Sequence, residues 1–274
     1  MGLLGAWLLS ILLLGTFLPS VSAQTFAVDT SSIAGITVAG AGTAQYQAVA
    51  DAVLGSARDP ETDARRPFGF VVSNNTSQPI VGFAARWEIT DSHGQQTERV
   101  MTRSLMESSQ LAIAPGESVV IVPFLVLAGN HRGIPGSVNS IMTGSDPAEF
   151  GSLQNARSIQ ATLDGVVFAS GQFAGPNAAN ELPYFQAEGA AGYDLASAII
   201  AKKEAGVAAA TIVDWLQQAA ATRATGSLPY RDWTTAVKAR EAGVYLRVCN
   251  SGGESKMFAF AEQRLQAPHF AVRP

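Results

Sequence analysis

The sequence predicts an α+β protein in which an antiparallel β-sandwich is followed by a helical unit. Between residues 65 and 168, segments that alternate apolar and polar residues are separated by turn-forming residues. This pattern is typical of antiparallel strands with one buried face. After residue 175 the chain becomes alanine-rich, and apolar residues recur at helical spacing. We therefore expect a sandwich over residues 24–175 and a helical region over residues 176–274.

Residues 1–23, MGLLGAWLLSILLLGTFLPSVSA, are predicted to be a signal peptide cleaved after Ala23. An apolar core runs from Leu3 to Leu18, and small residues precede the cleavage point, as a signal peptidase requires. The segment lacks the Lys or Arg that normally opens a signal peptide, so an uncleaved anchor is the alternative. Because the apolar core is shorter than the roughly 20 residues of a bilayer span, we expect export to the periplasm or the extracellular space.

The composition argues against a nucleic-acid partner. The 274 residues are 47% hydrophobic and 15% charged, with a net charge of -4, whereas nucleic-acid-binding surfaces are basic. We therefore expect no nucleic-acid partner and no membrane contact beyond the signal segment, which leaves an unknown protein or surface as the partner.

The single cysteine, Cys249, is expected to be a small buried residue, with an intermolecular disulfide or a reactive thiol as the alternatives.

Residues 33–54 imitate a dinucleotide-binding turn. A short apolar run precedes Gly40-Ala41-Gly42, and apolar residues at helical spacing follow. The third glycine position of that motif holds Gln45, so we interpret the segment as a strand, a turn and a helix, and we expect no cofactor.

The next segment, residues 65–94, predicts two antiparallel strands joined by an exposed turn. Phe68, Phe70 and Val72 share one face of the first strand, and the odd positions from Val81 to Ile89 share one face of the second. This places Trp87 in the core and its neighbours Arg86 and Glu88 in water. The turn is expected at residues 74–79, where Asn, Ser and Pro gather.

Three further strands are predicted at residues 97–103, 117–127 and 157–168. The second is apolar on both faces and is expected to be central, while the third places Ile159, Ala161, Leu163 and Val167 on one face. Residues 129–156 have no periodicity, and we expect a long loop there that is either functional or mobile.

FGFVVSNNTSQPIVGFAARWEI resembles the second and third strands of an immunoglobulin-like sandwich, with Trp87 where that fold often buries its tryptophan. LAIAPGESVVIVP resembles a later strand pair, and DGVVFASGQFAGPN, residues 164–177, is similar to segments of secreted bacterial proteins of unknown function. The resemblance covers residues 65–175 and departs from the family in lacking a cysteine pair. It implies a fold and no particular activity.

In the helical region, one apolar stripe includes Tyr193, Ala196 and Ile199, and a second runs from Thr211 to Ala219. A third helix is expected after Asp232, which would cap it, and a last one at residues 254–266.

The sequence contains no recognisable catalytic or metal-binding motif. Its three histidines are far apart, and the alternating acids of residues 59–63 fit a solvated turn better than a calcium loop. Tyr184 and Tyr230 are the tyrosines of two similar Leu-Pro-Tyr sequences, and Trp233 follows the second of them. These aromatic residues either dock helices onto the sandwich or line a recognition surface.

Two functional hypotheses follow. The first is an exported, non-catalytic binding or structural module, with Tyr184, Tyr230 and Trp233 as its candidate contacts. The second is an exported hydrolase whose catalytic groups converge only in the folded chain. A pocket in which His, Asp or Glu side chains meet would distinguish the two.

Overall fold

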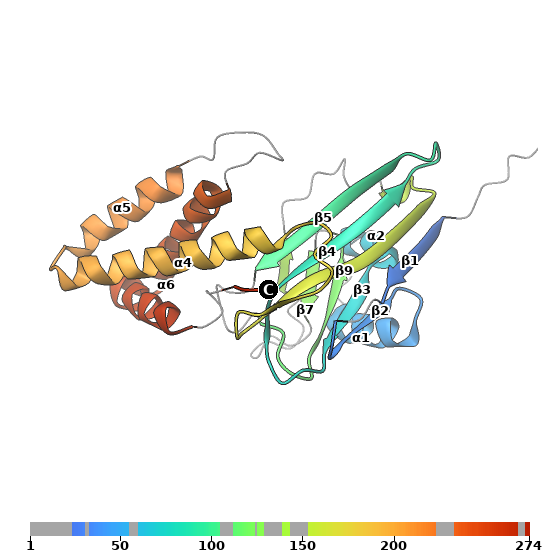
Figure 1. The fold of residues 1–274 in the computed structure, drawn as a ribbon, viewed down its shortest axis with the longest axis horizontal. Helices are drawn as coiled ribbons and strands as arrows, with labels where there is room; N and C mark the ends of the chain where they lie inside the picture. The colour runs from blue at the N-terminus through green and yellow to red at the C-terminus, as the bar shows by residue number, and fades with distance from the viewer. Residues whose placement is uncertain are drawn as a thin grey trace, which may run out of the picture.

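The computed structural model describes residues 24–30, 33–54, 60–104, 112–123, 125–128, 139–142, 153–222, 233–267 and 272–274. The predicted signal peptide and its cleavage site lie outside these residues. The fold is α+β, with two β-sheets, short helices between their strands and longer helices after them (Figure 1).

Each sheet has five strands. The first has the order β1 (Thr25–Asp29), β9 (Ser158–Phe168), β4 (Ile80–Thr90) and β5 (Gln96–Ser104), with β10 (Phe173–Ala174) also paired to β9. The second has the order β2 (Ile36–Gly40), β3 (Phe70–Asn74), β6 (Ser118–Val122), β7 (Leu125–Ala128) and β8 (Asn139–Met142). The β1–β9 pair is parallel, and the other strand pairs are antiparallel.

The largest hydrophobic core lies between the two sheets. Trp87 of β4 is fully buried there, with its ring centroid 6.0 Å from that of Phe70 of β3. Its indole Nε1 donates a hydrogen bond of 3.0 Å to the carbonyl oxygen of Phe68. The prediction that Trp87 is a core residue is confirmed, and its polar nitrogen is satisfied inside the core.

Two β-bulges change which residues face this core. Ile80 pairs with Phe168 and Gly82 with Val167, which leaves Val81 as an extra residue of β4. In β9, Asp164 is extra in the same way, because its two neighbours pair with consecutive residues of β4. An extra residue reverses the alternation beyond it. The prediction that Val81 and Val167 face the main core is therefore wrong, and both pack on the outer face of the sheet.

The turn at residues 74–79 connects the two sheets. The predicted turn between two strands is confirmed, and the strands that it joins, β3 and β4, belong to different sheets and do not pair with each other. Asn74 is buried rather than exposed. Its side-chain Nδ2 donates to the carbonyl oxygens of Gln78 and Ile113, at 2.8 and 2.9 Å. Its Oδ1 accepts from the backbone nitrogen of Thr76 at 3.1 Å, so the side chain closes the crossing turn.

The remaining strand predictions are confirmed in part. Residues 97–103 lie in β5, but residues 117–127 form two strands, β6 and β7, rather than one. Pro123 stands between them, and a proline cannot donate a ladder hydrogen bond. The predicted long loop contains the short strand β8, and most of its other residues lie outside the described ranges.

Helix α1 (Ala44–Leu54) covers the outer face of the second sheet, where Tyr46 and Ala50 pack in one cluster with Val71 and Val120. The hydroxyl of Thr43 accepts a hydrogen bond of 3.1 Å from the backbone nitrogen of Tyr46 and so caps the helix. The predicted strand, turn and helix of residues 33–54 are confirmed. Helix α2 (Pro60–Arg65) and the 3₁₀ turn η1 (Arg66–Phe68) then lead into β3.

The helical unit consists of α4 (Leu182–Glu204), α5 (Ala209–Ala221) and α6 (Trp233–Gln266), and it has its own core. Helix α6 is interrupted at Gly253, where φ is 76°. The two halves of α6 fold back on each other, as the 5.3 Å distance between the ring centroids of Tyr245 and Phe260 shows. Tyr193 is 49% exposed, so its predicted place in the apolar stripe is wrong. The buried face of α4 is centred on Leu195, Ala196 and Ile199.

The helical unit is attached to the sandwich at both ends. Phe185, near the start of α4, and Val272, near the end of the chain, pack in one cluster on the outer face of the first sheet. The backbone of Arg273 also exchanges hydrogen bonds with Gly171 and Phe173, at 2.9 and 2.7 Å. Figure 1 shows the helices extending away from the sheets while the C-terminus returns to them. Two attachments restrict how the helices can move relative to the sandwich.

Candidate functional site: a cleft between β1 and α1

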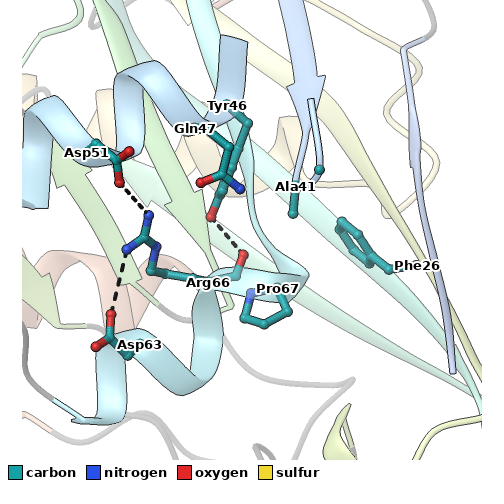
Figure 2. Close-up of a pocket in the computed structure, with 9 residues that line it drawn as sticks. Phe26, Ala41, Tyr46, Gln47, Asp51, Asp63, Arg66 and Pro67 are labelled. Atoms are coloured by element: carbon teal, nitrogen blue, oxygen red, sulfur yellow. Dashed lines mark hydrogen bonds and ion pairs between the residues drawn. The ribbon is translucent and has the colours of Figure 1, made fainter. Parts of the chain in front are cut away.

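An open cleft of about 680 Å³ lies where β1 meets α1 and η1 (Figure 2). This volume falls within the roughly 300–1,000 Å³ of small-molecule sites. Polar side chains come from α1, α2 and η1, while β1 and the β2–α1 turn contribute apolar groups and backbone. The lining residues are Phe26, Ala41, Gly42, Tyr46, Gln47, Asp51, Asp63, Arg66 and Pro67.

Arg66 is the centre of the polar wall. Its guanidinium lies between two carboxylates, with Nη2 3.0 Å from Oδ1 of Asp51 and Nη1 3.7 Å from Oδ1 of Asp63 (Figure 2). The side chain of Arg66 is 15% exposed, whereas those of Asp51 and Asp63 are 62% and 38% exposed. The carboxylates therefore face solvent more than the arginine that holds them. Together the three side chains leave one net negative charge.

Tyr46 connects this wall to the sandwich. Its buried hydroxyl donates a hydrogen bond of 2.7 Å to the carbonyl oxygen of Arg66. Burial raises the pKa of Tyr46 to about 12, so the phenol remains a donor at neutral pH. Gly69 permits this contact, because an added Cβ would lie 2.9 Å from the tyrosine hydroxyl. The backbone that carries Arg66 is therefore held against α1.

The facing side of the cleft is apolar. Phe26 of β1 is half-buried and makes a nearly perpendicular contact with Phe68, with ring centroids 6.3 Å apart. Gly42 has a φ of 96°, and among the described residues no atom beyond its chain neighbours lies within 4 Å of where its Cβ would stand. A ligand can therefore approach the backbone closely there. The exposed amide of Gln47 makes no side-chain hydrogen bond within the described part of the chain.

The aromatic candidates predicted from the sequence lie elsewhere. Tyr184, in the first turn of α4, is half-buried, and its hydroxyl accepts a hydrogen bond from Arg240. Its ring lies 5.7 Å from that of Phe185, at the joint between the helices and the sandwich. Tyr230 lies outside the described residues. Trp233 begins α6, but its side chain is not among those described.

Arg240 belongs to a second polar group, which is largely buried between α4 and α6. It pairs with Glu188 and lies 3.5 Å from Glu241, which in turn pairs with Arg264. Burial and the nearby carboxylate of Glu188 raise the pKa of Tyr184 to about 12. The opposite charges of this group neutralise one another, so it can fix the packing of the helices.

The histidines, the alternating acids and Cys249 do not gather into one site in the part of the fold that the structure describes. No group of three or more His, Cys, Asp or Glu side chains among the described residues is placed to hold a metal ion. Asp63, one of the alternating acids, pairs with Arg66 instead. His93 lies exposed in a turn, and His131 and His269 fall outside the described ranges. Cys249 is half-buried against the helical core.

Arg66, the arginine at the centre of the cleft, is not among the candidate residues predicted from the sequence. Its link to Asp63 has helical spacing and is readable from the sequence. Its link to Asp51 depends on how α1 packs against η1, and no local pattern indicates the contribution of Phe26.

Comparison with known proteins found no matching protein family, no similar curated protein and no similar solved structure. Among the described residues, no helix has both the length and the apolar character needed to cross a membrane.

Proposed function

We propose that this protein is an exported, non-catalytic binding module whose ligand site is the cleft between β1 and α1. The single observation behind the proposal is the composition of that cleft. Arg66, Asp51 and Asp63 form a mutually paired polar wall opposite the partly exposed ring of Phe26. In a concave site, convergent polar groups fix the orientation of a small molecule, and an exposed aromatic ring adds apolar contact.

The construction of the cleft supports binding over catalysis. Acid–base catalysis by two carboxyl groups requires two different environments, one that favours the acid and one that favours the base. Here Asp51 and Asp63 share the same partner, Arg66, and both face solvent. Two carboxylates that share one partner are better suited to holding a ligand than to acting as a separate acid and base. The hydrolase hypothesis predicts product release, which the experiment below also measures.

The remaining parts of the proposal concern the fold family and location. We propose that the two packed sheets are an immunoglobulin-like sandwich, because an apolar-patterned strand buries Trp87 between them. We also propose that the chain is exported and cleaved after Ala23. Intact-mass measurement of the secreted product should then give a chain that starts at Gln24. A membrane-bound product that retains Met1 would contradict export by cleavage.

A thermal-shift screen of the exported protein against soluble oligosaccharides, peptides and metabolites tests the binding proposal. Binding to the native state alone raises the melting temperature. A genuine ligand should lose this effect in Phe26→Ala and Asp51→Asn. It should keep the effect in the matched variants Tyr193→Ala and Asp194→Asn, which alter exposed residues of α4.

Two results would count against the proposal. If ligands stabilise all four variants equally, binding occurs at another surface. If mass spectrometry of the incubated mixtures detects cleaved ligand, and Asp51→Asn abolishes the cleavage, the protein is a hydrolase.

A further inference from the structure

We propose that the ligand of the cleft is a neutral saccharide, either free or as part of a surface glycan. This inference rests on the binding function proposed above and specifies its ligand class. It is drawn from three features of the cleft: the mixture of donors and acceptors on one wall, the aromatic ring on the other, and the internal pairing of the charges.

The polar wall offers both donors and acceptors at planar groups. Asp51 and Asp63 provide carboxylate oxygens, Arg66 provides guanidinium N–H groups, and Gln47 provides one of each kind. A sugar hydroxyl donates one hydrogen bond and accepts others. Neighbouring hydroxyls of a sugar ring can therefore bridge a carboxylate and the guanidinium or amide beside it, and hydrogen bonds to such charged groups are the stronger ones.

The facing wall suits the less polar side of a sugar ring. Phe26 contacts Phe68 almost perpendicularly, at 81°, and part of its surface remains exposed in the cleft. The face of an aromatic ring is electronegative, and the C–H groups on one side of a pyranose carry a small positive charge. A sugar placed between Phe26 and Arg66 would present C–H groups to the ring and hydroxyls to the polar wall.

The pairing of the charges favours a neutral ligand. Both carboxylates pair with the same guanidinium of Arg66, at 3.0 Å for Asp51 and 3.7 Å for Asp63, and one negative charge remains in excess. An anionic ligand would have to displace a carboxylate from the arginine, and a cationic ligand would compete with the arginine for both carboxylates. A neutral polyol can bind the partly exposed carboxylates without breaking either ion pair.

The test begins with an array of immobilised oligosaccharides that includes glucan, xylan and chitin fragments. The strongest binder is then titrated calorimetrically into the exported protein and its variants. Phe26→Ala and Asp51→Asn should each weaken binding by about tenfold or more, as expected for the loss of a main contact. Tyr193→Ala and Asp194→Asn should leave the affinity unchanged. Binding of the soluble oligosaccharide in the calorimeter supports a free sugar, whereas binding to the immobilised form alone supports a surface glycan.

The peptide trilysine serves as the cationic alternative. If trilysine binds in a way that depends on Asp51 while the array gives no binder, the cleft is a binding site but the saccharide inference is wrong. Array binding that is unaffected by Phe26→Ala and Asp51→Asn also overturns the inference. If neither the array, trilysine nor the thermal-shift screen gives a ligand that depends on the cleft, the proposed function falls as well. Circular dichroism of each variant confirms that a loss of binding does not reflect unfolding.

Discussion

The ring of Phe185 is seated directly over the backbone of Gly82. A methyl group added to Gly82 would lie 2.8 Å from Cε1 of Phe185, closer than two carbon atoms can pack. Phe185 is fully buried, and its ring centroid is 6.2 Å from that of Phe173. The missing side chain in β4 therefore provides the space in which the helical unit docks onto the sandwich.

Gly82→Ala should destabilise the protein by about 1–3 kcal/mol, because overpacking displaces Phe185 from its seat. Urea denaturation measures the loss, and hydrogen exchange should become faster in the first turns of α4. The matched variant Gly243→Ala should have the opposite effect. Gly243 lies inside α6, and its added Cβ would meet only the end of Arg247, at 3.8 Å. Replacing a helical glycine by alanine stabilises by about 1 kcal/mol. Equal losses for both variants would contradict this account of the joint.

Trp87→Ala should cost about 3–5 kcal/mol of unfolding free energy, the usual range for truncating a large buried aromatic residue. This is a large part of the roughly 5–15 kcal/mol by which domains are stable, so the melting temperature should fall sharply. Tyr193→Ala removes an aromatic ring that is 49% exposed and should change stability by less than about 0.5 kcal/mol. Similar small losses at both positions would mean that Trp87 is not the anchor of the core.

Arg86, the neighbour of Trp87, was expected in water, and this expectation is wrong. Its side chain is only 15% exposed, and it pairs with Glu88, with Glu98 at 3.2 Å and with the buried Asp164 at 3.9 Å. The bulge in β9 brings Asp164 to this position. A variant of Arg86 is therefore unsuitable as the control for Trp87→Ala, because it would break these ion pairs.

Arg264→Met should destabilise the protein by about 3–5 kcal/mol, because it leaves the carboxylate of Glu241 buried without its main partner. The side chains of Arg264 and Glu241 are only 3% and 1% exposed. The double variant Arg264→Met/Glu241→Leu should recover most of the loss, because an apolar pair needs no compensation. Denaturation of the single and double variants measures the coupling. A double variant as unstable as the single one would show that the ion pair is needed for the packing itself.

Glu181→Gln should make the protein more stable at pH 7 but not at pH 4. Burial raises the pKa of Glu181 above its usual 4.5, and the charges of Asp164 and Glu98 add to this, while a hydrogen bond of 2.6 Å from Thr102 opposes it. The folded state therefore holds this proton more tightly than the unfolded state. The resulting stabilisation is fully present below pH 4.5 and is lost as the pH rises through the folded pKa.

Glutamine keeps an acceptor for Thr102 and stays neutral. Its gain in stability over glutamate should therefore appear as the pH rises through the folded pKa of Glu181. Melting temperatures measured between pH 4 and 8 provide the comparison, and Glu204→Gln, at the exposed end of α4, is the control. An advantage that does not change with pH would exclude titration of Glu181 as its cause.

The individual strands and helices were predictable from the sequence because the spacing of apolar residues within each one shows which of its faces is buried. Period-two alternation placed Trp87 in the core, since successive strand residues point to opposite faces. Apolar residues at helical spacing marked α4 and α5, and a strand, turn and helix were readable around Gly40 and Gly42. These patterns depend only on which face of an element is buried.

The partners of those elements were decided only by the tertiary structure. Alternation shows that a strand has a buried face but not which sheet it joins, so the sequence left open that β3 and β4, although joined by one turn, lie in different sheets. A bulge leaves no local signal, so Val81 and Val167 were assigned to the wrong face. The cleft arises in the same way, since Phe26, Asp51 and Arg66 are far apart in the chain. They meet because long-range packing brings β1, α1 and η1 together, and burial of distant apolar surfaces is a property of the whole fold.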